Sequence, residues 1–164
     1  MNPSPAGERV FVGLGANLGN ARAAVEAACE LIHTLPGTAV VACSGLYRTA
    51  PVDAAGPDFI NAVAELRTGL SPAELLSALQ FIELAHGRAR PYRHAPRTLD
   101  LDLLLHGQQV LRGDTLTLPH PRLHQRAFVL RPLLDLAPGL SHPLLGPLQP
   151  FLAAAADQAI ERLP

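Results

Sequence analysis

Two aspartates separated by one residue carry the clearest chemistry in this chain. Asp100 and Asp102 lie in the run 99–105, an apolar segment typical of a β-strand. Side chains alternate along a strand, so both carboxylates share one face and the neighbouring leucines share the other. Carboxylates this close repel each other, and a hard cation such as Mg²⁺ relieves the repulsion. A face with two solvated acids explains the same spacing, so the pair alone leaves both interpretations open.

Arginines upstream of the pair favour a substrate that carries several phosphates. The segment 87–97 contains glycine, prolines and four arginines: Arg88, Arg90, Arg93 and Arg97. Alone, such a segment is typical of a solvated basic loop. Beside two metal-binding carboxylates it fits a polyphosphate, because Mg²⁺ bridges some phosphate oxygens while guanidinium groups neutralise the others. The same segment is a candidate lid.

The chain has 13 basic residues, all of them arginine, and the absence of lysine excludes several phosphate-binding designs. A P-loop lysine, a protein-kinase strand lysine and a lysine Schiff base are all impossible. The net charge of −1 argues against a non-specific nucleic-acid binder, which needs excess cations. We therefore expect arginine, histidine, backbone amides or metal to hold any bound anion.

The cysteines and the apolar segments set the expected compartment. Cys29 and Cys43 form no CxxC motif, so the sequence indicates neither a disulfide framework nor a zinc site. Residues 1–8 lack the apolar core of a signal peptide, and 136–156 contains too many prolines for a membrane helix. We expect a cytoplasmic protein that binds neither membrane nor nucleic acid.

Other motifs are weaker when each is taken alone. The glycines of 13–19 depart from the dinucleotide-binding pattern, and we interpret them as residues of a tight turn after a strand. Phe59 and Asn61 share one strand face and could hold a flat heterocycle, although a core phenylalanine with a polar neighbour is the more ordinary explanation. Gln80 and Glu83 share a helix face that is usually solvated, and His120 lies in a proline-flanked loop.

Together these segments resemble the 6-hydroxymethyl-7,8-dihydropterin pyrophosphokinase family. The signature Arg93 to Leu104 is the most specific part, and the resemblance covers all but the last twenty-five or so residues. The remaining segments that carry it are 13–19, 47–51, 58–62, 80–83, 87–90, 118–121 and 126–130.

The resemblance implies transfer of pyrophosphate from ATP to the hydroxymethyl group of the pterin, leaving AMP. It implies that Asp100 and Asp102 bind two Mg²⁺ ions and that Arg88 and Arg97 stabilise the transferred charge. For the pterin, it implies contacts from Thr49, Ala50, Val52, Phe59, Asn61 and Phe128, with the two rings sandwiching the substrate. For the nucleotide, it implies contacts from Gln80, Glu83, Arg88, Arg90, Arg97, Leu103, His120 and Arg126.

Three positions depart from the pattern of some relatives. His94 replaces a tryptophan, Thr115 an arginine and Pro121 a tyrosine. We expect these changes to affect ATP affinity and lid motion more than the transfer chemistry.

The elements that position these residues follow from periodicity and turn signals. Strands are predicted over 9–15, 38–47, 59–66 and 99–105, with helices from Asn20 to Leu35 and from Ser71 to His86. This order predicts an α+β fold, a ferredoxin-like βαββαβ core within a single domain over 1–164. Short strands at 109–111 and 116–118 and helices near 126–136 and 148–163 are predicted to follow.

Two rival classes share this order of elements. An RNA-recognition domain places aromatic side chains on its central strands in a basic setting, whereas this chain carries two acids there. A ligand-sensing regulatory domain needs no aspartate pair combined with an arginine segment. We therefore favour the enzyme, acting on small-molecule substrates as a monomer.

Overall fold

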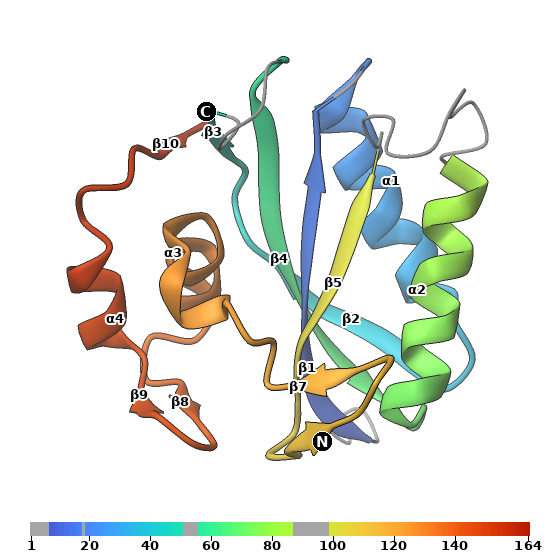
Figure 1. The fold of residues 1–164 in the computed structure, drawn as a ribbon. Coiled ribbons are helices and arrows are strands. Elements are labelled where there is room, and N and C mark those ends of the chain that lie inside the picture. Colours follow the sequence, from blue (N-terminus) through green and yellow to red (C-terminus); the bar gives the residue numbers. More distant parts are fainter. Residues whose placement is uncertain (1–6, 18, 51–55, 87–98) are drawn as a thin grey trace, which may run out of the picture.

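The computed structural model describes residues 7–17, 19–50, 56–86 and 99–164. A six-stranded antiparallel sheet forms its centre, with helices on both faces (Figure 1). Helices α1 (Ala21–His33) and α2 (Pro72–His86) cover one face. Helices α3 (Ala127–Leu136) and α4 (Gln149–Ala154) lie on the other. The chain is therefore a mixed α and β protein, as predicted.

The sheet is built from β1 (Glu8–Ala16), β2 (Thr38–Cys43), β3 (Tyr47–Thr49), β4 (Phe59–Thr68), β5 (Asp100–His106) and β10 (Glu161–Arg162). Their order is β10-β3-β4-β1-β5, and β2 also pairs with β4. Every pairing is antiparallel. The sheet thus brings β4 and β5 to either side of β1, although all three are far apart in the sequence.

Local capping signals begin both long helices as predicted. Asn20 Oδ1 accepts a hydrogen bond from the backbone N–H of Ala23 at 3.1 Å, which caps α1. At the start of α2, Ser71 Oγ accepts from the Glu74 N–H and Glu74 Oε1 accepts from the Ser71 N–H. This reciprocal pair is the capping box that the sequence indicates.

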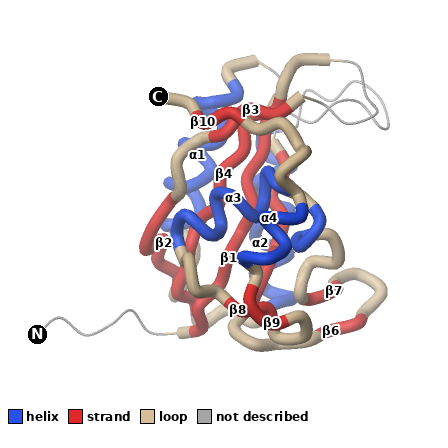
Figure 2. Tube along the Cα trace, turned by 90° about the vertical axis from the view of Figure 1, so that its left-hand side faces the viewer, coloured by secondary structure: helices blue, strands red, loops and turns tan. Residues whose placement is uncertain are grey.

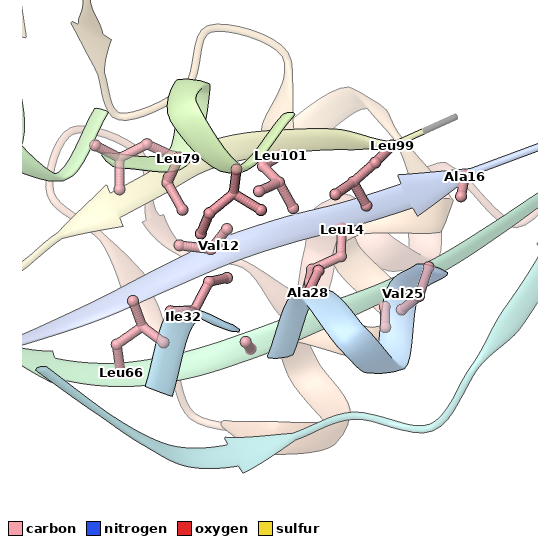
Figure 3. Packing of buried hydrophobic residues seen from close by; sticks show 14 of the residues in the cluster. Val12, Leu14, Ala16, Val25, Ala28, Ile32, Leu66, Leu79, Leu99 and Leu101 are labelled. Atoms are coloured by element: carbon pink, nitrogen blue, oxygen red, sulfur yellow. The ribbon is translucent and has the colours of Figure 1, made fainter. Parts of the chain in front are cut away.

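The main core lies between the sheet and the helices α1 and α2. Figure 3 shows Val12 and Leu14 of β1 and Leu99 and Leu101 packed with side chains of both helices. Leu103 belongs to the same core. Because side chains alternate, Asp100 and Asp102 lie on the opposite face of the sheet, as predicted.

The predicted strand over 38–47 is wrong in its extent, because the chain forms two strands there. β2 ends at Cys43 and β3 begins at Tyr47. Between them Ser44 Oγ accepts a hydrogen bond from the Val63 N–H at 2.9 Å. This bond binds the bend to β4, so both short strands pair with the same long neighbour.

The predicted helix over 148–163 is also wrong. It ends early, at Ala154, and residues 161–162 pair with β3 as strand β10 (Figure 2). The side chain of Gln158 accepts a hydrogen bond from the Ala127 N–H and donates one to the Gln125 carbonyl. These contacts favour an irregular segment, because they hold the chain against the start of α3.

The remaining elements are short and lie away from β3 and β10 (Figure 2). Strands β6 (Leu111–Arg112) and β7 (Thr117–Leu118) pair with each other, as do β8 (Ser141–His142) and β9 (Gly146–Pro147). A 3₁₀ turn, η1 (Leu123–Gln125), precedes α3. The predicted short strands after β5 are confirmed, with slightly different bounds.

Candidate active site

Three strands bring an aspartate, a glycine and an asparagine into one row. Gly15 of β1 lies opposite Asp100 of β5 on one side and opposite Asn61 of β4 on the other. We call Asp100, Gly15 and Asn61 the polar row. It lies where β1 ends and β4 and β5 begin, on the face that α1 and α2 leave uncovered. Asp102 lies beside the row, opposite Gly13.

Gly13 and Gly15 keep the centre of this surface free of side chains. Both lie inside β1, and neither has a positive φ. A Cβ atom on Gly15 would lie 3.0 Å from Asn61 Oδ1. The interpretation of both glycines as turn residues is therefore wrong, although it holds for Gly19, whose φ of 61° suits the turn before α1. Only backbone separates the aspartates from the asparagine.

Asn61 is buried and held in one orientation by its neighbour on β3. The residue is 6% exposed, and Nδ2 donates a hydrogen bond to Thr49 Oγ1 at 2.9 Å. Thr49 pairs with Phe59, which is half-buried and shares the face of Asn61. Three of the residues expected to contact the pterin, Thr49, Phe59 and Asn61, therefore lie together, and the exposed Ala50 directly follows Thr49.

Glu83 of α2 contacts the backbone between the two aspartates. Its Oε2 accepts a hydrogen bond from the Leu101 N–H at 2.8 Å. The bond joins the last turns of α2 to the start of β5, where Asp100 and Asp102 are half-buried. This carboxylate thus fixes the strand that carries the aspartates.

His120 lies near the aspartate end of the row. Its backbone N–H donates to the Leu104 carbonyl at 2.9 Å, and its Nδ1 accepts from the Arg122 N–H at 3.2 Å. Burial lowers the pKa of His120, the charges of Arg126 and Arg122 lower it further, and Asp100 opposes them. The imidazole is therefore biased toward its neutral form, which accepts hydrogen bonds.

Arg126 and Phe128 stand at the beginning of α3. The guanidinium of Arg126 lies over the Phe128 ring, 5.5 Å from its centroid. A guanidinium over an aromatic face is held by the ring quadrupole and by shared packing. The cation is thereby positioned on the face of the sheet that carries the polar row, where α3 packs against β4.

The other predicted site residues divide into two groups. Val52, Arg88, Arg90 and Arg97, together with the candidate lid, lie outside the described residues. Gln80 is exposed on α2, and the side chain of Leu103 is buried in the core on the opposite face. Any contact of Leu103 with a nucleotide therefore involves its backbone.

Sequence reasoning missed two features that shape this site. The spacing role of Gly13 and Gly15 depends on their register with Asp102, Asp100 and Asn61. Their one clue was the Gly-x-Gly alternation inside an apolar strand. The second feature is a hydrogen bond from the Tyr47 hydroxyl to Asp135, which joins β3 to α3. No local pattern relates these two residues.

The described residues contain no group of three or more histidine, cysteine or acidic side chains that could enclose a metal ion. The donor set present is the half-buried pair Asp100 and Asp102. Such a pair suits Mg²⁺, which keeps water and substrate phosphate oxygens in its coordination sphere rather than a full set of protein ligands.

Comparison with known proteins identifies the family. The model of the 7,8-dihydro-6-hydroxymethylpterin-pyrophosphokinase (HPPK) family matches residues 11–138. The chain belongs to the HPPK family. A 2-amino-4-hydroxy-6-hydroxymethyldihydropteridine pyrophosphokinase of Pseudomonas aeruginosa is 49% identical over 158 residues, covering 96% of this chain and 98% of the relative. A protein of the same name from Haemophilus influenzae is 41% identical over 134 residues, covering 81% and 84%.

Solved structures agree on the fold. Wild-type HPPK-DHPS of Plasmodium falciparum superposes with a TM-score of 0.71 at 13% identity, over 93% of this chain. This chain covers 45% of that longer one. The likeness supports a mixed α and β fold with an antiparallel sheet.

The family establishes the reaction of the chain. HPPK enzymes transfer pyrophosphate from ATP to hydroxymethyldihydropterin in folate biosynthesis. The predicted family, activity and ATP co-substrate are therefore confirmed.

Across the described parts of the chain, no helix combines the length and apolar character needed to cross a bilayer.

Proposed function

We propose that the transfer takes place across the polar row, with the pterin at Asn61 and the ATP triphosphate at Asp100 and Asp102. The observation that carries this proposal is the register in which Gly15 faces both Asp100 and Asn61. β5 and β4 lie on either side of β1, so the distance between them is two strand spacings, about 10 Å. That span suits a substrate whose ring lies on one strand while its hydroxymethyl group reaches a phosphate at the other.

The pterin pocket in this proposal is formed around Asn61. The amide is buried and oriented by Thr49, so Oδ1 remains on the side of Gly15 to accept from the heterocycle. Phe59 and Phe128 supply the two rings that sandwich the pterin, because aromatic faces bury flat ligands well. Backbone groups of Thr49, Ala50 and Val52 complete the pocket.

We assign the metal and the triphosphate to the aspartate end. Asp100 and Asp102 would hold two Mg²⁺ ions, which would neutralise phosphate charge and lower the pKa of the attacking hydroxyl. Arg88 and Arg97 stabilise charge on the transferred group, and Arg90, Arg126, Gln80 and Glu83 bind the nucleotide. Because Nδ1 of a neutral His120 accepts from the Arg122 N–H, Nε2 carries the proton and donates it to a phosphate oxygen without adding a full charge.

The order of strands and helices supports a proposal for the type of α+β fold. The order β5-β1-β4-β2, with α1 after β1 and α2 after β4, supports the proposal of a ferredoxin-like arrangement. We propose that the chain is one such domain over 1–164, extended by the C-terminal elements, and that it acts as a monomer.

A product assay with matched variants tests the assignment of the aspartates. Wild-type protein, ATP, Mg²⁺ and the hydroxymethyl dihydropterin are expected to yield AMP and the pterin diphosphate. Asp102→Ala is expected to lose this activity by several orders of magnitude, since it removes charge compensation for the triphosphate. Asp157→Ala, at an exposed position far from the row in sequence, is the matched control.

Product identity separates the possible outcomes. Release of ADP in place of AMP would contradict pyrophosphate transfer. Retention of full activity by folded Asp102→Ala, checked by circular dichroism, would contradict the role of the aspartate pair and leave the family assignment intact.

A further inference from the structure

The two cysteines of the chain meet in space. Cys29 lies in the middle of α1 and Cys43 at the end of β2, and their Sγ atoms are 2.7 Å apart. Both are free thiols. A disulfide joins sulfur atoms at about 2.05 Å. The two side chains therefore already point toward each other, and little backbone movement is needed to bond them.

The pair lies away from the polar row. Cys43 is opposite Ala64 of β4, a residue of the core that α1 covers. Residues that face each other across paired strands share one side of the sheet. Cys43 thus belongs to the α1 face, whereas Asp100, Gly15 and Asn61 occupy the other. The proposed transfer mechanism makes no use of either thiol.

The two thiols differ in exposure and in the direction of their pKa shifts, so they are suited to different roles. Cys43 is exposed, and its hydrogen bond with Cys29 lowers its pKa. Cys29 is half-buried, and its pKa is raised by that same hydrogen bond, by burial and by the nearby charges of Cys43, Glu26 and Glu30. The accessible thiol is the one that ionises first, which is the requirement for an attacking nucleophile.

We propose that Cys43 and Cys29 form a site of reversible oxidation by low-molecular-weight disulfides such as oxidised glutathione. The Cys43 thiolate attacks one sulfur of the small disulfide, forms a mixed disulfide and releases one small thiolate. Cys29, after giving its proton to solvent, attacks Cys43 Sγ and expels the second small thiolate. Two protein thiols and one small disulfide thereby become one protein disulfide and two small thiols.

The cross-link joins α1 to the end of β2. It closes a loop in the unfolded chain and so reduces the conformational entropy that folding must overcome. Ser44, the next residue, already binds this part of the chain to β4. We therefore expect the oxidised protein to be more resistant to heat than the reduced protein.

Intact-mass measurement on the full chain tests the proposal. The reduced protein is incubated with increasing oxidised glutathione at mildly alkaline pH, quenched with acid and measured without reductant. The expected product is a monomer that has lost two hydrogen atoms, and dithiothreitol restores the original mass. Its melting temperature is expected to exceed that of the reduced form.

Two single variants separate the roles of the thiols. Cys29→Ser is expected to stop at one glutathione adduct on Cys43, because no resolving thiol is present. Cys43→Ser is expected to react more slowly, because the remaining thiol is half-buried and has a raised pKa. Melting curves confirm that each variant folds before the reaction is followed.

Three results would overturn the proposal. They are retention of both thiols by the wild-type protein, a stable glutathione adduct on the wild-type protein, and a disulfide-linked dimer as the main product. The first contradicts the reactivity of Cys43, the second contradicts attack by a neighbouring Cys29, and the third contradicts an intramolecular bond.

Discussion

Glu83 accepts a hydrogen bond from the backbone N–H of Leu101, the residue between the two aspartates, at 2.8 Å. A helix residue thus holds the backbone of the strand that presents both carboxylates. A charge-assisted bond of this kind contributes about 1.5–3 kcal/mol. We infer that Glu83 positions Asp100 and Asp102 in addition to its predicted place near the nucleotide.

Substitution of Glu83 tests the positioning role. Glu83→Ala leaves the Leu101 N–H without this acceptor and is expected to lower kcat/KM about tenfold or more, the rate equivalent of about 1.4 kcal/mol. Glu83→Gln retains an oxygen that can accept the bond and is expected to recover most of the loss. Steady-state kinetics for both substrates provide the measurement. Equal activity losses in the two variants would show that the carboxylate charge matters rather than the bond to Leu101.

The two glycines of β1 offer a second, internally controlled test. Gly15→Ala places a Cβ atom 3.0 Å from Asn61 Oδ1, whereas the nearest atoms to a Cβ on Gly13 are 3.6 Å away. Overpacking costs about 1–3 kcal/mol, so Gly15→Ala is expected to raise the KM for the pterin about tenfold. Gly13→Ala is expected to change it little. The idea fails if both variants bind the pterin like the wild type.

Local patterns in the sequence predicted the elements well. The alternation of leucine and aspartate over 99–103 depends only on the period of a strand, and the structure places the three leucines in the core while both aspartates are half-buried on the other face. The capping box joins Ser71 and Glu74, which are three positions apart, and it also forms as predicted. Signals of this range need no tertiary information.

Features that depend on distant partners could not be predicted. The break between β2 and β3 involves Ser44 and Val63, and strand β10 is defined by its pairing with β3, in which Glu161 lies opposite Arg48. The role of Gly15 likewise depends on register with residues far away in the chain. Periodicity reports neither register nor pairing partner, so these relationships appear only in the folded chain.

The hydrogen bond between Thr49 and Asn61 leads to a third prediction. Thr49→Val keeps the shape of the side chain but removes the acceptor at 2.9 Å, leaving a buried amide donor unpaired. That change costs about 1–3 kcal/mol. We expect a lower melting temperature and a KM for the pterin raised about tenfold, with a smaller effect on the KM for ATP.

Thr49→Ser is the matched control, because it retains the hydroxyl oxygen and loses a methyl group. Its KM for the pterin is expected to stay near that of the wild type. If the serine and valine variants bind the pterin equally well, the orientation of the Asn61 amide does not determine recognition.

A buried histidine outside the site leads to the last prediction. His142 Nδ1 accepts hydrogen bonds from the N–H groups of Leu144 and Leu145, each at 3.1 Å. Burial and the neighbouring His124 lower the pKa of His142 from its ordinary value of 6.5. At pH values below about 6.5 the unfolded chain binds more protons than the folded chain. This contribution to stability is therefore complete above about pH 6.5 and decreases as pH falls.

His142→Asn keeps an acceptor but cannot be protonated, and its melting temperature is expected to fall less than that of the wild type between about pH 7.5 and pH 5.5. His120, whose pKa is also lowered, leaves a residual dependence of the same sign in the variant. An identical fall in both proteins would exclude His142 as a source of acid sensitivity.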